Sequence, residues 1–189
     1  MFKEKIQPSL VLTLICLITC ALLVIAYNAT YVDNTGVITE AMTAGLEEIY
    51  GTSDGFAMKL DENDKIYAPE GVTCVLVDEN GNAAFEITTD GYSSGGIHVL
   101  VGMDASGAVS GVSVLSLGET PGLGTNTNKP EFLNLFKGMT GPVTIVKNKS
   151  NPGENEVNAV TSATFSSKGV ASAVNIALDA YKKCGGEFK

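Results

Sequence analysis

The chain opens on a long apolar segment: residues 9–29 contain no charged side chain and are dominated by Leu, Ile, Val, Ala and Cys. A bilayer core of roughly 30 Å requires about 20 helical residues, so a segment of this length can span a membrane. A cleaved signal peptide has an apolar region of only about 7 to 15 residues, followed by small residues at its cleavage site. This segment stays apolar up to Tyr27. We therefore expect residues 1–29 to form a cytoplasmic N-terminus and a retained transmembrane helix.

A second segment, residues 37–50, has an amphipathic pattern that predicts a helix ending at Gly51. Its apolar positions recur at helical spacing: Ile38, Met42, Leu46 and Ile49. Residues 52–69 are polar and predict turns. We expect residues 30–69 to be a helical and polar connector whose helix packs on the domain that follows.

From residue 70 onward, short apolar runs alternate with turn residues, which is typical of strands. The runs expected as strands are residues 72–77, 84–88, 96–103, 109–115 and 144–147. Two dipeptides favour hairpin turns between them: Asn80-Gly81 and Ser106-Gly107. Two further segments have helical patterns: residues 130–136 and 166–183. The sequence thus predicts an α+β domain over residues 70–189, an antiparallel sheet with flanking helices.

Charged residues are distributed unevenly along the chain. Lys3 and Lys5 precede the apolar segment, and the next lysine is Lys59, so the positive-inside rule places the N-terminus in the cytoplasm. The rest of the chain is then extracytoplasmic. Beyond the apolar segment there are 10 lysines against 20 acidic residues, and the chain has no arginine. Such an acidic domain repels phosphate backbones, which argues against nucleic-acid binding.

Side chains that usually perform catalysis are scarce. His98 is the single histidine and lies in an expected strand, so a catalytic triad or a histidine metal cluster cannot be assembled. We interpret His98 as an outward-facing strand residue. The four cysteines, Cys16, Cys20, Cys74 and Cys184, lack the spacing of a metal site, although the last two could pair in an oxidising compartment. Chemistry in this chain would therefore depend on a bound cofactor.

Two loops remain as candidates for binding a cofactor. Residues 119–124, Glu-Thr-Pro-Gly-Leu-Gly, contain a strong Pro-Gly turn, and the glycines let the backbone approach a planar ligand closely. A plain surface turn explains this loop as well. Residues 158–167 place several hydroxyls directly before the last helix. Ser166 or Thr164 would ordinarily cap that helix, but its free N–H groups and positive end also suit a phosphate.

Taken together, the two loops resemble the FMN-binding domain shared by the G subunit of the Rnf ferredoxin:NAD oxidoreductase and the C subunit of the sodium-pumping NADH:quinone reductase. Gly91-Tyr92-Ser93 and the strand at residues 97–102 add to the resemblance and follow in the family's order. In this family a flavin transferase esterifies the last threonine of a Ser/Thr-Gly-Ala-Thr segment with the phosphate of FMN. The segment at residues 161–164, Thr-Ser-Ala-Thr, matches. The resemblance therefore implies a covalent FMN on Thr164.

The resemblance also implies a set of cofactor-binding residues around Thr164. These are Thr161, Ser162, Ala163, Glu119, Thr120, Leu123 and Gly124. Among them, Thr120, Leu123 and Gly124 would contact the flavin ring. The family usually has Gly where this chain has Ser162 and Asp where it has Asn158. The 119–124 loop is more similar to that of the Rnf protein than to that of the quinone reductase protein.

By this resemblance the chain is expected to be an electron-relay subunit of an Rnf-type ion-translocating ferredoxin:NAD oxidoreductase in a bacterial cytoplasmic membrane. It would have no independent catalysis, and its partners would be the other subunits and, during maturation, the flavin transferase. The alternatives are a free-standing extracytoplasmic flavoprotein reductase, the homologous quinone reductase subunit, and a non-redox scaffold module. Neighbouring genes for integral membrane partners would favour the relay over the free-standing reductase, and yellow colour that survives denaturation of the purified protein would eliminate the scaffold.

Overall fold

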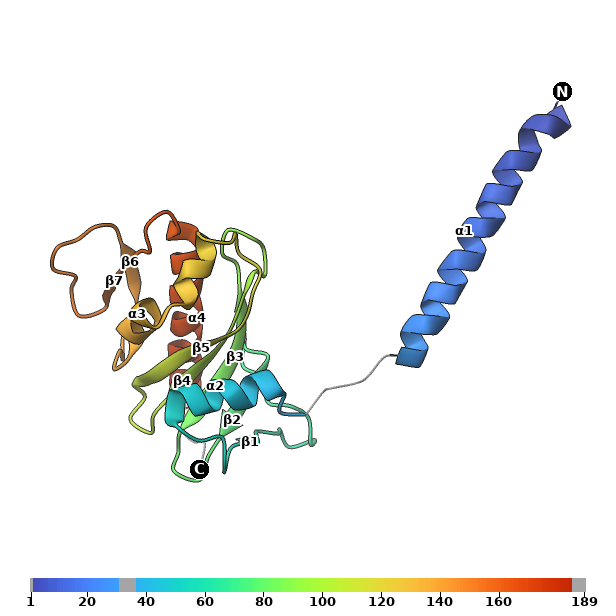
Figure 1. Cartoon of the computed structure of the whole chain (residues 1–189). Coiled ribbons are helices and arrows are strands. Elements are labelled where there is room, and N and C mark those ends of the chain that lie inside the picture. Colours follow the sequence, from blue (N-terminus) through green and yellow to red (C-terminus); the bar gives the residue numbers. More distant parts are fainter. Residues whose placement is uncertain (1, 31–36, 185–189) are drawn as a thin grey trace. The chain divides into compact units, whose positions relative to one another are not determined.

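The computed structural model describes residues 2–30 and 37–184 and divides the chain into two units, Met1–Thr35 and Gly36–Lys189 (Figure 1). In the first unit, helix α1 spans Phe2–Thr30. Its segment Leu10–Thr30 has 21 residues, a mean hydropathy of 2.8 and no buried share. The hydroxyl of Thr19 donates a hydrogen bond to the backbone carbonyl of Ile15, one turn earlier. The hydroxyl is thus paired within the helix, which is needed because lipid offers it no hydrogen-bond partner. Among the described helices, α1 is the one long and apolar enough to cross a membrane, as the hydropathy pattern predicts.

The second unit is built on a five-stranded sheet in the order β1-β2-β3-β4-β5, with every neighbouring pair antiparallel. Its strands are β1 (Ala57–Met58), β2 (Cys74–Val77), β3 (Ala83–Thr89), β4 (Ile97–Met103) and β5 (Val109–Leu117). Because each strand pairs with its neighbour in sequence, the sheet is the antiparallel one that the pattern predicts. Strand β1 lies in a segment expected to contain only turns. Two residues are too short a strand for a period of two to be recognised.

The two tightest hairpins, β2–β3 and β4–β5, have equivalent turns. In each turn an aspartate carboxylate, of Asp78 or Asp104, accepts hydrogen bonds from the backbone N–H groups two and four residues later. A glycine with positive φ completes each turn, Gly81 at 86° and Gly107 at 82°. Glycine adopts this left-handed conformation without the Cβ clash of other residues, which is why both dipeptides could be recognised in the sequence.

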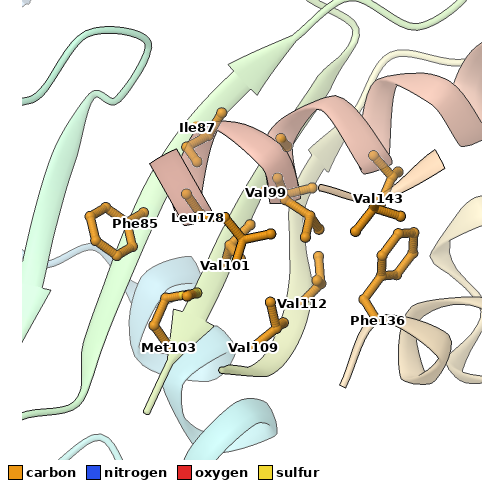
Figure 2. Close-up of a cluster of buried hydrophobic side chains, with 14 of the residues drawn as sticks. Phe85, Ile87, Val99, Val101, Met103, Val109, Val112, Phe136, Val143 and Leu178 are labelled. Carbon is orange, nitrogen blue, oxygen red and sulfur yellow. The ribbon is translucent and has the colours of Figure 1, made fainter. Parts of the chain in front are cut away.

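Helices cover both faces of the sheet (Figure 1). Helix α4 (Thr164–Lys183) packs on one face, where Leu178 joins a core that includes Phe85 and Val99 (Figure 2). Helix α2 (Glu40–Tyr50) packs on the other face, and its Leu46 joins a second cluster with Leu100. Neighbouring residues of β4 thus face opposite helices, because side chains alternate along a strand. The expected helix at residues 166–183 is confirmed and begins two residues earlier.

The segment expected as a connector is part of the same compact unit as the sheet. Helix α2 starts after Thr39, whose side chain accepts from the Met42 N–H, and ends at Gly51 with φ 78°. The Tyr50 hydroxyl donates to the backbone carbonyls of Ala83 and Met103, both at 3.0 Å. The helix is therefore fixed to the sheet by hydrogen bonds as well as by apolar packing. The part of the connector at residues 31–36 lies outside the described residues.

The region between β5 and α4 consists of short elements. These are the 3-10 helix η1 (Gly124–Asn128), α3 (Pro130–Leu133), the 3-10 helix η2 (Asn134–Phe136), and strands β6 (Thr144–Val146) and β7 (Glu156–Asn158). Strands β6 and β7 pair in parallel, and β7 was not expected from the sequence. Asn158 closes the loop between them, because its side-chain amide accepts from the Lys149 N–H and donates to the Lys149 carbonyl, both at 2.9 Å. An aspartate cannot make the second of these bonds.

Candidate functional site

A pocket of about 420 Å³ is lined by residues of the β3–β4 loop, of the segment that follows β5 and of the start of α4. The residues lining it are Tyr92, Glu119, Thr120, Leu123, Gly124 and residues 162–166. Both loops identified in the sequence therefore meet in one pocket, although about 40 residues separate them in the chain. The packing of α4 against β3 and β4 produces this proximity.

The start of α4 lacks the side-chain cap that the sequence suggested. Ala163 occupies the capping position and offers no hydrogen bond from its side chain. No acceptor for the backbone N–H groups of Thr164, Phe165 and Ser166 is found in residues 37–184. The prediction that Thr164 or Ser166 caps the helix is wrong, because both are inside its first turn. A helix start with three unpaired donors therefore borders the pocket, and such a terminus favours an anion.

Thr164 is the first residue of α4 and is half-buried at the pocket wall. Its hydroxyl has no hydrogen-bond partner within the described part of the chain, so its oxygen is not engaged in holding the fold. Ser162 enters the same turn with a φ of 63°, a left-handed conformation that favours glycine. The turn is closed by a hydrogen bond from the Ala163 N–H to the Val160 carbonyl, at 2.9 Å.

The loop at residues 119–124 is held by its own backbone. The carbonyl of Thr120 accepts from the N–H of Leu123 at 3.2 Å, and the N–H of Gly122 donates to the Thr125 hydroxyl at 2.9 Å. Gly122 has a φ of 74°, as the Pro-Gly turn predicts. This turn leaves Leu123 45% exposed at the pocket. The loop therefore presents an apolar side chain to any ligand in the pocket.

Glu119 is the one carboxylate among the described residues that line the pocket, and it is only 6% exposed. It accepts hydrogen bonds from the backbone N–H groups of Tyr92 and Ser93, at 3.2 and 3.0 Å, and from the Ser166 hydroxyl at 2.5 Å. Burial by itself raises the pKa of Glu119, but the three hydrogen bonds outweigh it and leave the pKa below its usual value. The carboxylate is therefore negatively charged at neutral pH. Within the described chain, no lysine lines the pocket.

Tyr92, Phe165 and Ser166 were not among the expected cofactor-binding residues, although they belong to segments that the sequence identified, and all three line the pocket. Tyr92 and Phe165 are 75% and 66% exposed, which is unusual for aromatic side chains in a domain with a complete core. An aromatic residue beside Gly91 in a glycine-rich loop was a signal that could have identified Tyr92. Thr161 lies elsewhere, in a neighbouring hollow with Lys129.

The histidine and the cysteines lie outside this pocket. His98, in β4, has a side chain that is 32% exposed and contacts a carboxylate oxygen of Glu86 at 2.8 Å. Cys74 donates to the other oxygen of Glu86, at 3.2 Å, while Cys184 lies 2.9 Å from the Tyr67 hydroxyl. The two cysteines are free thiols with different partners, so in this structure they do not form a disulfide.

Comparison with known proteins identifies the class to which this fold and pocket belong: residues 91–179 match the FMN-binding domain family. The matched region contains Tyr92, Glu119 and the whole stretch around Thr164. The G subunit of the proton-translocating ferredoxin:NAD(+) oxidoreductase complex of Clostridium ljungdahlii is 30% identical over 184 residues, covering 95% of each chain. The G subunit of an ion-translocating oxidoreductase complex of Aliivibrio fischeri is 31% identical over 93% of this chain and 90% of that protein. The chain belongs to the family of these G subunits.

Two further similarities cover part of the chain. The G subunit of the Na(+)-translocating ferredoxin:NAD(+) oxidoreductase complex of Acetobacterium woodii is 34% identical over 96 residues, and the alignment spans 50% of this chain and 45% of that protein. A solved structure, the C subunit of the Na(+)-translocating NADH-quinone reductase from Parabacteroides distasonis, is 30% identical with a TM-score of 0.46. It covers 58% of this chain and 61% of its own.

Proposed function

We propose that this chain is the flavin-carrying electron-transfer subunit of a membrane-bound, ion-translocating ferredoxin:NAD oxidoreductase, with FMN attached through a phosphoester to Thr164. Family membership supports the coarser statement, a flavin electron-transfer subunit of such an assembly. The position of Thr164 carries the finer one. Its unengaged hydroxyl borders a pocket of about 420 Å³, at a helix start with unpaired N–H groups.

The electrostatics of the pocket explain why a covalent bond is useful there. No lysine of the described chain lines the pocket and Glu119 contributes a negative charge, so a doubly charged phosphate would be held mainly by backbone N–H groups. An ester between the Thr164 oxygen and the phosphate removes one negative charge and prevents the cofactor from dissociating. When bound, the flavin supplies the redox chemistry, which is one- or two-electron transfer. The chain's own residues orient the flavin and tune its potential.

The apolar residues at the pocket support a stacking contact with the flavin ring. Leu123, Tyr92 and Phe165 are exposed at its edge and belong to three different segments. A planar ring placed between such side chains is shielded from water on its faces, while its edge remains accessible for electron transfer. We assign Thr120, Leu123 and Gly124 to the ring and Ser162, Ala163 and Thr164 to the phosphate end.

Partners and location follow from the same proposal. The relatives are G subunits of larger complexes, and α1 carries a segment apolar enough to anchor the chain beside other membrane proteins of such an assembly. A flavin transferase would form the ester, and the lysine distribution around the apolar segment favours an extracytoplasmic FMN domain. No independent substrate is assigned to this chain. Electrons would pass through it between neighbouring redox centres of the complex.

The attachment is tested by mass spectrometry of protein produced together with its flavin transferase. The peptide containing Thr164 should be heavier by one FMN less water, and its fluorescence should survive SDS gel electrophoresis. Thr164→Val removes the nucleophilic oxygen and should abolish the adduct. Thr144→Val makes the same chemical change at an exposed strand residue outside this pocket and should retain it. An adduct that persists in Thr164→Val would show that another residue is the acceptor.

The electron relay is tested with the same variants in membranes, as ferredoxin-dependent NAD reduction at matched levels of the complex. The Thr164 side chain makes no hydrogen bond in the described structure, so Thr164→Val should change the free energy of unfolding by no more than about 0.5 kcal/mol. Activity should nevertheless be lost, because the cofactor is no longer held. Activity close to that of Thr144→Val would refute the relay function.

A further inference from the structure

Glu119 is connected to every segment that forms the pocket. It follows β5, and its carboxylate joins the β3–β4 loop through the N–H groups of Tyr92 and Ser93 and joins α4 through Ser166. Each carboxylate oxygen already has a donor from the protein. A cofactor in the pocket therefore meets a carboxylate whose hydrogen-bonding capacity is largely used to hold the protein together.

Three glycines pack directly against this carboxylate. A Cβ atom added at Gly91, Gly96 or Gly124 would lie 2.5, 2.9 or 2.6 Å from one of its oxygens. At Gly124 the same atom would also lie 2.6 Å from the Ser166 hydroxyl. These distances are shorter than real Cβ contacts allow, so a side chain at any of these positions would displace Glu119. The glycines let two loops close on the carboxylate.

The negative charge of Glu119 has no compensating cation among the described residues that line the pocket. Its hydrogen bonds come from neutral donors, two backbone amides and one hydroxyl. An electron taken up by a flavin adds negative charge to it wherever no proton accompanies the electron. A fixed anion in a poorly solvated wall of the pocket therefore disfavours reduction, since charges interact more strongly where water is excluded.

We propose that Glu119 is the positioning residue of this pocket: its carboxylate ties the β3–β4 loop, the 119–124 loop and the start of α4 together before FMN arrives, and its charge then lowers the reduction potential of the bound flavin. The first effect is a property of the protein alone. The second rests on the proposed function, because it needs the flavin in the pocket.

The positioning effect is measured on the full-length chain in detergent, without cofactor, by amide hydrogen exchange. Glu119→Gln keeps the shape of the side chain, but its NH2 group cannot accept from a backbone N–H. The Tyr92 and Ser93 amides should exchange faster by a factor on the order of ten. Glu79→Gln, the same change at an exposed hairpin residue, should leave their exchange unchanged. Unchanged exchange in Glu119→Gln, or acceleration spread evenly over the domain, would overturn the positioning role.

Gly124→Ala provides a second variant that keeps the charge. Its added Cβ crowds Glu119 and Ser166, so the same amides should lose protection. Gly118→Ala is the matched control, because a Cβ there meets its nearest neighbour at 3.5 Å, an ordinary contact. Equal protection in the two alanine variants would contradict the close packing on which the proposal depends.

The charge effect is measured by redox titration of the flavin-loaded chain. Glu119→Gln should shift the midpoint potential to more positive values. Ser166→Ala removes a hydrogen bond but leaves the charge, so its potential should not become more positive. Equal positive shifts in both variants, or none in Glu119→Gln, would refute the electrostatic role. Flavin content in SDS gels reports separately on attachment at Thr164, so failure of the proposed function is distinguishable from failure of this inference.

Discussion

Ser162 has a backbone conformation that does not suit its residue type. It occupies the position of the glycine in the Ser/Thr-Gly-Ala-Thr segment that this chain resembles, and its φ of 63° is left-handed. This conformation costs a residue with a Cβ atom roughly 1–2 kcal/mol but is open to glycine. The Ser162 side chain is exposed and makes no hydrogen bond in the described structure. The serine therefore adds backbone strain next to the proposed attachment residue, and its side chain makes no hydrogen bond that would offset this strain.

Ser162→Gly should relieve this strain. We expect the free energy of unfolding to rise by about 0.5–1 kcal/mol, because the lower backbone strain is partly offset by the greater entropy of glycine in the unfolded chain. Thermal unfolding of the full-length chain in detergent measures the change. Ser162→Ala keeps the Cβ atom and should give no gain. An equal gain in both variants would show that the hydroxyl, and not the backbone, causes the difference.

At the scale of elements, α2 covers the face of the sheet opposite to the face that α4 covers. Leu46 and Met42 of α2 pack with Leu100 of β4, and Phe56, just before β1, joins them. Without these residues that face of β4 would be exposed. The pocket is formed by the loops that follow β3 and β5 and by the start of α4, so α2 supports the site through the sheet, although none of its residues lines it. We therefore expect the domain to require the segment before residue 70.

A fragment of residues 37–189 should fold, whereas a fragment of residues 70–189 should not. The shorter fragment loses the burial of Met42, Leu46 and Phe56, worth about 1.5–3 kcal/mol for each large apolar side chain. The sum is comparable to the total stability of a typical domain, about 5–15 kcal/mol. Circular dichroism and chemical unfolding of both fragments measure this. A cooperative transition of equal stability in the shorter fragment would contradict it.

At the scale of the whole molecule, the chain combines an apolar helix with an acidic domain. The segment Leu10–Thr30 of α1 is apolar on all sides and none of it is buried in the structure. A helix of this kind is stable in lipid, where its backbone groups are paired within the helix. The lysines before the apolar segment are the basis for expecting the N-terminus inside.

Topology is tested with a cysteine at the exposed position Asn151, in a chain whose Cys16, Cys20 and Cys184 are changed to serine. Cys74 can remain, because burial and the nearby charge of Glu86 raise the pKa of its thiol to about 12 and the residue is only 2% exposed. A membrane-impermeant thiol reagent should label Asn151→Cys in intact cells. Labelling only after lysis would place the domain in the cytoplasm.

Features governed by local sequence were predictable. The apolar span, the helix of residues 37–50, the hairpin glycines and four of the five sheet strands each follow from the residues that form them. Strands β1 and β7 were missed: β1 has two residues, too few to show a period, and β7 forms through its parallel pairing with β6. Local propensity determines which elements form when they are long enough to show their pattern.

The sequence by itself determined the two candidate loops, the proposed acceptor Thr164 and the resemblance to a flavin-binding family. Only the tertiary structure decided that the loops share one pocket, that Tyr92 joins them, and that Ser166 bonds to Glu119 instead of capping α4. These features depend on distances between residues far apart in the chain. Such distances are set by the packing of α4 and the sheet, which no local pattern in the sequence records.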